Sequence, residues 1–306
     1  MKEITIHSPG TVANLVCGFD VLGLCLTDPF DIMRVRLLDK KEVIVRTTDG
    51  YPLPTDPAQN TAGAPLLEMV ANLEQDVGFE VIITKQIKPG SGIGSSAASA
   101  AGAVVAANEL LGNIFSREDL VRFAMFGEKV ASGVKHADNI APCIYGGITL
   151  IRSIFPLDIV SIPAPPLFVT VVHPQIEVRT SDSRQILRKE FLLKDAIRQW
   201  GNIAGLVAGL MKNDYELIGR SMEDVIIEPV RSILIPGFHE IKRQSRDAGA
   251  IGGGISGSGP SVFMLSRDEP TALAVEQAMK SIYDRIGLNY YTYVTTISQQ
   301  GVTLIA

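Results

Sequence analysis

The chain has 306 residues, 46% of them hydrophobic, and a formal net charge of −5 at pH 7. Its length and composition predict a globular protein with two domains or one large one, and exclude a disordered chain. The acidic balance argues against nucleic acid as the principal partner, and no apolar run is long enough to span a membrane. Three cysteines without metal-ligand spacing and an N-terminus without an apolar signal core suit a reducing compartment, so we expect a cytoplasmic protein.

The first half of the chain mixes strand and helix patterns. Alternating apolar residues predict strands over residues 2–7, 30–38, 42–48, 79–87 and 144–151. Helical periodicity and start signals predict helices over residues 62–76, 97–111 and from 116 towards 129. The strands at 30–38 and 42–48 are expected to pair with each other across Asp39–Lys41.

A proline-rich stretch over residues 155–166 is the best candidate for a domain boundary. Beyond it, strands are predicted over residues 167–173, 261–265 and 290–297. Helices are predicted over residues 182–188, 194–211, 214–221, 237–247 and 270–286. This mixed order is typical of an α+β sandwich with helices on one face of the sheet.

The most informative segment is P-G-S-G-I-G-S-S-A-A at residues 89–98, which lies between a predicted strand and an Ala-rich helix. The unpaired N–H groups of a helix N-terminus and its dipole favour a bound phosphate, and glycines let the backbone approach it closely. The segment lacks the G-K-[ST] of a Walker A loop, and its context is not that of a dinucleotide fingerprint. A tight turn without a ligand is the alternative.

Two further segments place polar side chains among apolar or glycine residues. Asn14 and Asp20 stand in a glycine-containing apolar segment, where they either face a pocket or cap turns. Glu128, His136 and the pair Asp138–Asn139 fall between a helix end and a strand, and these groups can bind a metal or hydroxyls. The alternative for the second group is a solvated polar connection.

Late in the chain, the run G-G-G-I-S-G-S-G-P at residues 252–260 precedes an apolar strand and could form a second anion-binding nest. Arg231 lies between proline-containing turns, and Arg184 follows a polar segment. Either arginine could receive a substrate carboxylate through its planar fork, or could lie on the surface.

Three of these segments together resemble the GHMP small-molecule kinases: P-G-T-V-A-N-L at 9–15, P-G-S-G-I-G-S-S-A-A at 89–98 and G-I-S-G-S-G-P-S-V-F at 254–263. Their order and separation match that superfamily over essentially the whole chain. Within it, three features are similar to the homoserine kinases: A-N-L-V-C-G-F-D-V-L-G at 13–23, H-A-D-N-I-A-P at 136–142 with Y-G-G, and I-E-P-V-R at 227–231 with L-I-P-G-F.

The resemblance implies an α+β, two-domain GHMP kinase fold. A ribosomal-S5-like N-terminal domain (1–157) would bind ATP, and a ferredoxin-like C-terminal domain (158–306) would complete an active site between them. The implied activity is ATP-dependent phosphorylation of the side-chain hydroxyl of L-homoserine to O-phospho-L-homoserine, in threonine biosynthesis. The implied cofactors are ATP and Mg²⁺, and the implied assembly is a homodimer.

The resemblance also assigns roles to residues. ATP would contact Asn60, Pro89, Gly90, Ser91, Gly92, Ile93, Gly94, Ser95, Ser96, Ala97, Gly257 and Ser258, and the late loop over 254–259 would close the site. Mg²⁺ would be held by Ser96 and Glu128. Homoserine would be held by Asn14, Asp20, His136, Asn139, Arg184 and Arg231. Arginine for the carboxylate and Asp20 for the ammonium is also the charge matching that the chemistry favours.

The catalytic candidates are Asn139 and Asp138. Mevalonate-kinase-like relatives place an aspartate where this chain has Asn139, and an amide is not a useful proton acceptor. Phosphoryl transfer has a loose transition state, so alignment by Asn139 can suffice, and Asp138 is the alternative base.

Two other functions stay open from the sequence. One is a GHMP kinase that acts on mevalonate or a sugar. Such a substrate has no amine, so Asp20 would have no obvious use in binding it. The other is a non-catalytic nucleotide-binding regulator, against which the retained Ser96 and Glu128 count.

Overall fold

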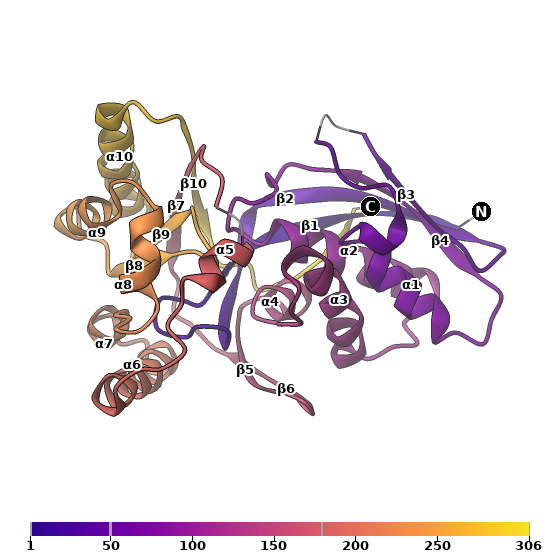
Figure 1. Ribbon diagram of the computed structural model, residues 1–306, viewed down its shortest axis with the longest axis horizontal. Helices are drawn as coiled ribbons and strands as arrows, with labels where there is room; N and C mark the ends of the chain where they lie inside the picture. Colours follow the sequence, from indigo (N-terminus) through magenta and orange to yellow (C-terminus); the bar gives the residue numbers. More distant parts are fainter. Residues whose placement is uncertain (1, 49–50, 179, 306) are drawn as a thin grey trace.

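The structure is a computed structural model that describes residues 2–48, 51–178 and 180–305, and Figure 1 shows two sheets side by side along its long axis. The strands are β1 (Glu3–Ala13), β2 (Leu22–Leu38), β3 (Val43–Thr47), β4 (Gly78–Thr84), β5 (Ile148–Ile154), β6 (Leu157–Ile162), β7 (Phe168–Pro174), β8 (Gly252–Ile255), β9 (Val262–Ser266), β10 (Tyr290–Thr296) and β11 (Thr303–Ile305). The α-helices are α1 (Gly63–Ala71), α2 (Ser95–Leu110), α3 (Arg117–Ser132), α4 (Ile140–Tyr145), α5 (Thr180–Gln185), α6 (Leu193–Lys212), α7 (Tyr215–Ser221), α8 (Glu228–Arg231), α9 (Phe238–Asp247) and α10 (Glu269–Ile286). Two short 3₁₀ turns cover Pro57–Gln59 and Ser232–Leu234.

The larger sheet has the order β11-β1-β2-β4-β3, with β5 paired to β2 and β6 paired to β5. Helix α2 packs closely on β1 and β2 because almost all of its side chains are small and buried. Helix α3 begins with a capping box between Ser116 and Asp119, which confirms the helix start predicted there. Helix α2 therefore lies against the sheet, and α3 packs on α1 and α2.

The predicted pairing of the strands around 30–38 and 42–48 is wrong. Strand β3 pairs in parallel with β4, and β4 pairs with β2. Helix α1 provides the crossover that a parallel β3–β4 pair requires. Alternation predicts the strands themselves, but a short connection between two strands does not exclude the insertion of a later strand between them.

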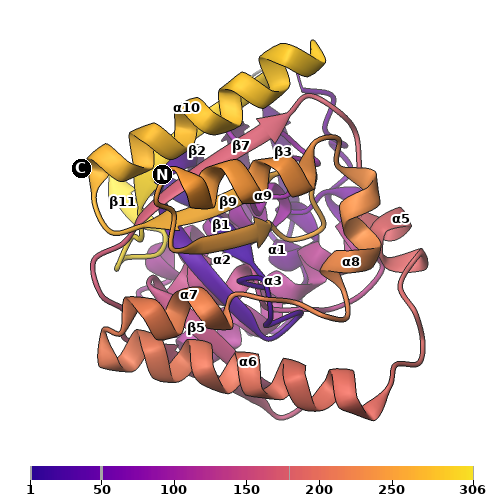
Figure 2. The same cartoon turned by 90° about the vertical axis from the view of Figure 1, so that its left-hand side faces the viewer.

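The smaller sheet has the order β10-β7-β9-β8 and carries helices on both faces, so the prediction of helices on one face is wrong (Figure 2). Alternate residues of β7 and β9 point to opposite sides, as in any strand. Val172 and Met264 pack with α9 and α10. Val171 and Phe263 pack with α6, α7 and residues of β2, in a core that joins the two sheets.

The boundary predicted after residue 157 falls at the first residue of β6, which pairs with β5 in the larger sheet. Near the end of the chain, β11 returns to pair with β1. The stretch 155–166, predicted as the best candidate for a domain boundary, therefore contains a strand of the larger sheet. The division into domains over 1–157 and 158–306 stays a prediction.

The strand predicted over 144–151 is in part wrong, because α4 continues through Tyr145 and β5 begins at Ile148. Strand β8 was not predicted because three of its four residues are glycines, which carry no hydropathy pattern. A Cβ on Gly253 would lie 2.0 Å from the carbonyl oxygen of Phe263, so the close strand pairing needs glycine there. Across the described ranges, every helix is too short or too polar to cross a bilayer.

Candidate active site

A cavity of about 720 Å³ brings the predicted segments together between the two sheets. Its walls come from the loop before α2, the end of α3, the connection to α4, helix α5 and the loop between β8 and β9. The predicted site residues that line it are Asn14, Asp20, Pro89, Gly90, Gly92, Gly94, Ser95, Ser96, Glu128, His136, Asp138, Asn139, Arg184, Arg231, Gly257 and Ser258.

Four predicted nucleotide residues do not line the cavity: Asn60, Ser91, Ile93 and Ala97. The Asn60 side chain instead accepts hydrogen bonds from the backbone N–H groups of Ala62 and Gly63 and donates to the Pro54 carbonyl, at 2.8, 3.2 and 2.7 Å. It fixes the start of α1. Ser91 and Ile93 of the loop and Ala97 of α2 are buried.

The glycine loop has the geometry of an anion cradle. Gly90, Gly92 and Gly94 have φ angles of +74°, +83° and +72°, in the region that favours glycine. Helix α2 begins at Ser95, and no side chain caps its first N–H groups among the described residues. A Cβ on Gly94 would lie 2.0 Å from Thr11 Oγ1, which shows how closely the loop packs on β1.

The late glycine loop is hydrogen-bonded to the first one. Ser256 Oγ donates to the Gly92 carbonyl at 2.7 Å, and Ser261 Oγ donates to the Ser91 carbonyl at 2.6 Å. The two glycine segments, which lie more than 150 residues apart in sequence, therefore form one wall of the cavity.

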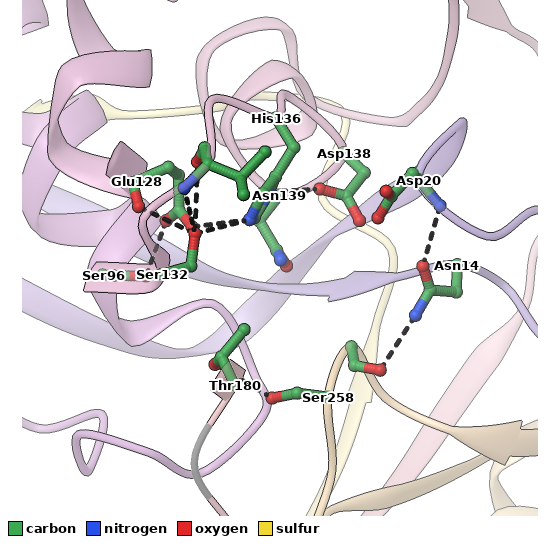
Figure 3. Close-up of polar contacts among 12 residues, drawn as sticks. Asn14, Asp20, Ser96, Glu128, Ser132, His136, Asp138, Asn139, Thr180 and Ser258 are labelled. Atoms are coloured by element: carbon green, nitrogen blue, oxygen red, sulfur yellow. Dashed lines mark hydrogen bonds and ion pairs between the residues drawn. The ribbon is translucent and has the colours of Figure 1, made fainter. Parts of the chain in front are cut away.

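A buried chain of polar groups extends from the first turn of α2 (Figure 3). Ser96 Oγ donates to Glu128 Oε1 at 2.6 Å, and Glu128 Oε2 lies 3.4 Å from His136 Nε2. His136 Nδ1 lies 2.9 Å from Asp138 Oδ1. The Ser96 hydroxyl and the Glu128 carboxylate therefore meet at the start of α2, directly after the glycine loop.

Burial and neighbouring charges shift the pKa values of this cluster of polar groups. Burial raises the pKa of Glu128, although His136 and Ser96 oppose the shift. Burial favours the neutral form of His136, but the hydrogen bond and charge of Asp138, with Glu128, raise the pKa of this imidazole to about 9. A hydroxyl beside a buried carboxylate is a donor set that suits Mg²⁺, so these residues fit the ion.

Two residues at the loop were not predicted. Lys85 lines the cavity beneath α2 and donates to the Ser95 carbonyl at 2.9 Å, and it forms an ion pair with buried Asp31. Thr11 Oγ1 donates to Asn139 Oδ1 at 2.8 Å. A lysine at the end of an apolar strand, directly before the glycine loop, was the signal available for Lys85.

The opposite part of the cavity carries paired charges. Arg184 Nη2 donates to Asp20 Oδ1 at 2.6 Å. Arg231 is 3% exposed and donates through Nη1 to the Gly257 carbonyl at 3.0 Å and through Nε to the Ser183 carbonyl at 3.1 Å. Burial lowers the pKa of Arg231 to about 10, and neighbouring Arg184 adds to the shift. Arg231 is therefore charged at neutral pH.

Asn14 joins the two parts of the site. Its Oδ1 accepts from the Asp20 backbone N–H at 3.1 Å, and its Nδ2 donates to the Gly257 carbonyl at 2.9 Å. Asp20 has a φ of +61°, a conformation that non-glycine residues adopt rarely. The side chain of Asn14 thus fixes both the turn that presents Asp20 and the late glycine loop.

Comparisons with known proteins agree with this architecture. The family models for the GHMP kinase N-terminal and C-terminal domains match residues 63–147 and 206–285. Homoserine kinases of Chloroherpeton thalassium and Methanocella arvoryzae are 44% and 40% identical, each over 100% of this chain, and over 100% and 98% of their own length.

A crystal structure of homoserine kinase from Cytophaga hutchinsonii is 49% identical, with a TM-score of 0.95 over 100% of this chain and 98% of that one. The L. major mevalonate kinase, solved with R-mevalonate, is 16% identical with a TM-score of 0.70, a likeness of fold alone. The α+β GHMP kinase fold predicted from the sequence is thereby confirmed. The chain belongs to the homoserine kinase family of the GHMP kinases.

Proposed function

We propose that the protein transfers the γ-phosphoryl group of ATP to the side-chain hydroxyl of L-homoserine, giving O-phospho-L-homoserine and ADP, as a step in threonine biosynthesis. One observation carries this proposal: a single cavity is lined by the glycine loop and uncapped start of α2 at one part and by Asp20, Arg184 and Arg231 at the other. Membership of the homoserine kinase family supports it.

For the nucleotide, we infer that the first N–H groups of α2 and the loop over residues 89–97 hold the phosphates, with Gly257 and Ser258 closing over them. Ser96 and Glu128 would hold Mg²⁺. When bound, the ion neutralises negative charge on the phosphoryl group that is transferred. Lys85, paired with Asp31 beneath α2, holds the Ser95 carbonyl at the start of the helix.

For the acceptor, Asp20 would bind the ammonium group of homoserine, and Arg184 and Arg231 would bind its carboxylate. The Asp20–Arg184 ion pair, with 2.6 Å between Oδ1 and Nη2, would separate when homoserine binds. Asp20 would then bind the positive ammonium group of the zwitterion, and Arg184 its negative carboxylate. Asn14 holds the turn that carries Asp20, and His136 and Asn139 line the wall between the acceptor and the loop.

We infer that alignment, without a general base, carries the reaction. The Asp138 carboxylate bonds to His136, and Asn139 is held by Thr11 beside Gly94 of the loop. From that position the Asn139 amide can orient the acceptor hydroxyl towards the γ-phosphorus. A loose transition state needs little proton removal before the new P–O bond forms, so the hydroxyl proton can pass late to an oxygen of the transferred phosphoryl group and from there to water.

Asn139→Ala should lower kcat about 30-fold, because the hydroxyl loses its orientation. Asp138→Asn should lower kcat less than tenfold, since the amide can still bond to His136. Steady-state kinetics with saturating ATP and homoserine measures both, with Asn113→Ala in the exposed turn after α2 as the control. If Asp138→Asn abolished turnover with the homoserine KM unchanged, Asp138 would be a general base.

The direct test of the function is ADP release with homoserine, threonine, serine, mevalonate and galactose as acceptors. We expect the highest kcat/KM with homoserine, because its ammonium and carboxylate both find partners. Preferred turnover of mevalonate or galactose would contradict the proposal. ATP binding without turnover of any acceptor would indicate a regulator.

We also infer a cytoplasmic homodimer that does not act on nucleic acid. The three cysteines are free and buried, which suits a reducing compartment. Support for the dimer comes from α6, which runs along one edge of the molecule in Figure 2. Leu193, Ile197 and Trp200 recur at helical spacing on this helix and are 68%, 57% and 59% exposed. An apolar stripe of this kind is typical of a covered surface.

Ile197→Glu should convert the dimer to a monomer, because it places a charge in the middle of the stripe. Sedimentation velocity at several protein concentrations measures the change. Ile114→Glu, at a similarly exposed isoleucine remote in sequence, is the control and should leave the dimer intact. A wild-type protein that stays monomeric throughout would contradict the dimer.

A further inference from the structure

Phe19 lies at the acceptor part of the cavity, next to the proposed ammonium-binding Asp20. Its ring contacts two cations at once. The guanidinium carbon of Arg231 lies 4.8 Å from the ring centroid, and that of Arg184 lies 5.4 Å from it. Phe19 is thus the aromatic side chain that both proposed carboxylate-binding arginines share.

The two arginines need such a partner because they repel each other. The charge of Arg184 contributes to the lowered pKa of Arg231, after burial. In addition, Arg184 Nε is buried and has no hydrogen-bond partner within the described part of the chain. The negative face of an aromatic ring attracts guanidinium groups and offsets part of the repulsion between them.

The chemistry of a ring suits this position better than a carboxylate would. An acidic side chain between the arginines would form hydrogen bonds with the same N–H groups that a substrate carboxylate needs. A phenyl ring offers no hydrogen-bond acceptor of that kind. It can hold two cations close together and leave their donor edges available.

The backbone around Phe19 is fixed. The Gly18 N–H donates to the Asn14 carbonyl at 2.7 Å, and the Leu22 N–H donates to the Gly18 carbonyl at 2.9 Å. A Cβ on Gly18 would lie 2.5 Å from the Leu22 side chain, so this tight turn needs glycine. The ring is therefore presented from a rigid turn, which suits a positioning role.

We propose that Phe19 is a positioning residue that holds Arg184 and Arg231 as a converging pair for the carboxylate of the acceptor. The proposal rests on the proposed function, and it deepens the acceptor site. Phe19 acts through the two arginines and does not take part in the phosphoryl transfer.

Phe19→Leu and Phe19→Tyr test the proposal, because leucine keeps an apolar side chain while tyrosine keeps the ring. We expect Phe19→Leu to lower kcat/KM for homoserine about tenfold, mainly through KM, and to leave the ATP KM within twofold. Phe19→Tyr should stay within threefold of wild type. A purely structural role would instead change the ATP KM and the melting temperature together with the homoserine KM.

A double-mutant cycle with Arg231→Met separates action through the arginines from direct contact with substrate. In the Arg231→Met background, Phe19→Leu should lower kcat/KM for homoserine clearly less than tenfold. The same tenfold loss in both backgrounds would overturn the proposal, as would a Phe19→Leu variant that matches wild type. If the wild-type protein did not phosphorylate homoserine, the proposed function and this proposal would both fail.

Discussion

Glu128→Gln should lower kcat about a thousandfold with MgATP and homoserine at saturation. Glutamine keeps the shape of the side chain and can still accept from Ser96 Oγ, whose hydrogen bond to Glu128 is 2.6 Å long. What the variant loses is the negative charge that would hold Mg²⁺. A charge that stabilises the transferred phosphoryl group contributes several kcal/mol, and each 1.36 kcal/mol corresponds to about tenfold in rate.

Because Glu128 is buried, the loss of its charge as a ligand for Mg²⁺ is hard to compensate. Glu128 is 3% exposed, so solvent cannot easily replace its carboxylate as a ligand of Mg²⁺. Raising the Mg²⁺ concentration should therefore restore only part of the activity, with a higher half-saturating Mg²⁺ concentration than wild type. Both quantities come from initial rates of ADP release over a Mg²⁺ series.

Glu118→Gln is the matched control, because Glu118 lies exposed in the first turn of the same helix, α3. It should leave kcat and the Mg²⁺ dependence unchanged. A Glu128→Gln variant with kcat within threefold of wild type would show that this carboxylate does not hold the ion.

The local parts of the site could be predicted from the sequence, because strand, glycine loop and helix follow one another along the chain. Gly94 and Ser96 line the cavity because they lie at the N-terminus of α2, which begins there. The acceptor part could not be assembled in this way. Asp20 and Arg184 are 164 residues apart, and only the packing of the two sheets brings them to 2.6 Å.

The errors have a common physical cause. Strand alternation reports which face of a strand is buried but not which strand lies beside it, so β3 was paired with β2 instead of β4. The assignment of Asn60 to the nucleotide rests on resemblance and stays a prediction; its three side-chain hydrogen bonds fix the start of α1. Phe19 could not be predicted in its role because an isolated aromatic residue carries no pattern until its neighbours in space are known.

Arg231→Met should raise the homoserine KM several hundredfold and change the ATP KM less than threefold. Arg231 is charged at neutral pH and buried, so a substrate carboxylate that met methionine would lose its partner in a place that water reaches poorly. Removal of one member of a buried charge pair costs about 2–5 kcal/mol, which corresponds to a change of this size. Initial rates with each substrate varied in turn measure the two constants.

Arg231→Lys keeps the charge and loses the planar fork, so its homoserine KM should fall between those of wild type and Arg231→Met. Arg220→Met, at an exposed arginine near the end of α7, is the control for the loss of an arginine as such. Its two KM values should match those of wild type.

The ATP KM distinguishes two possible roles of Arg231, because this side chain also holds the late glycine loop. Its Nη1 donates to the Gly257 carbonyl, which accepts from Asn14 as well, and Ser256 beside it donates to Gly92 of the first glycine loop. If the main role of Arg231 were to fix these loops, the variant would weaken ATP and homoserine binding equally. A rise confined to homoserine would show that Asn14 and Ser256 are sufficient to hold the loops, and that the guanidinium serves the acceptor.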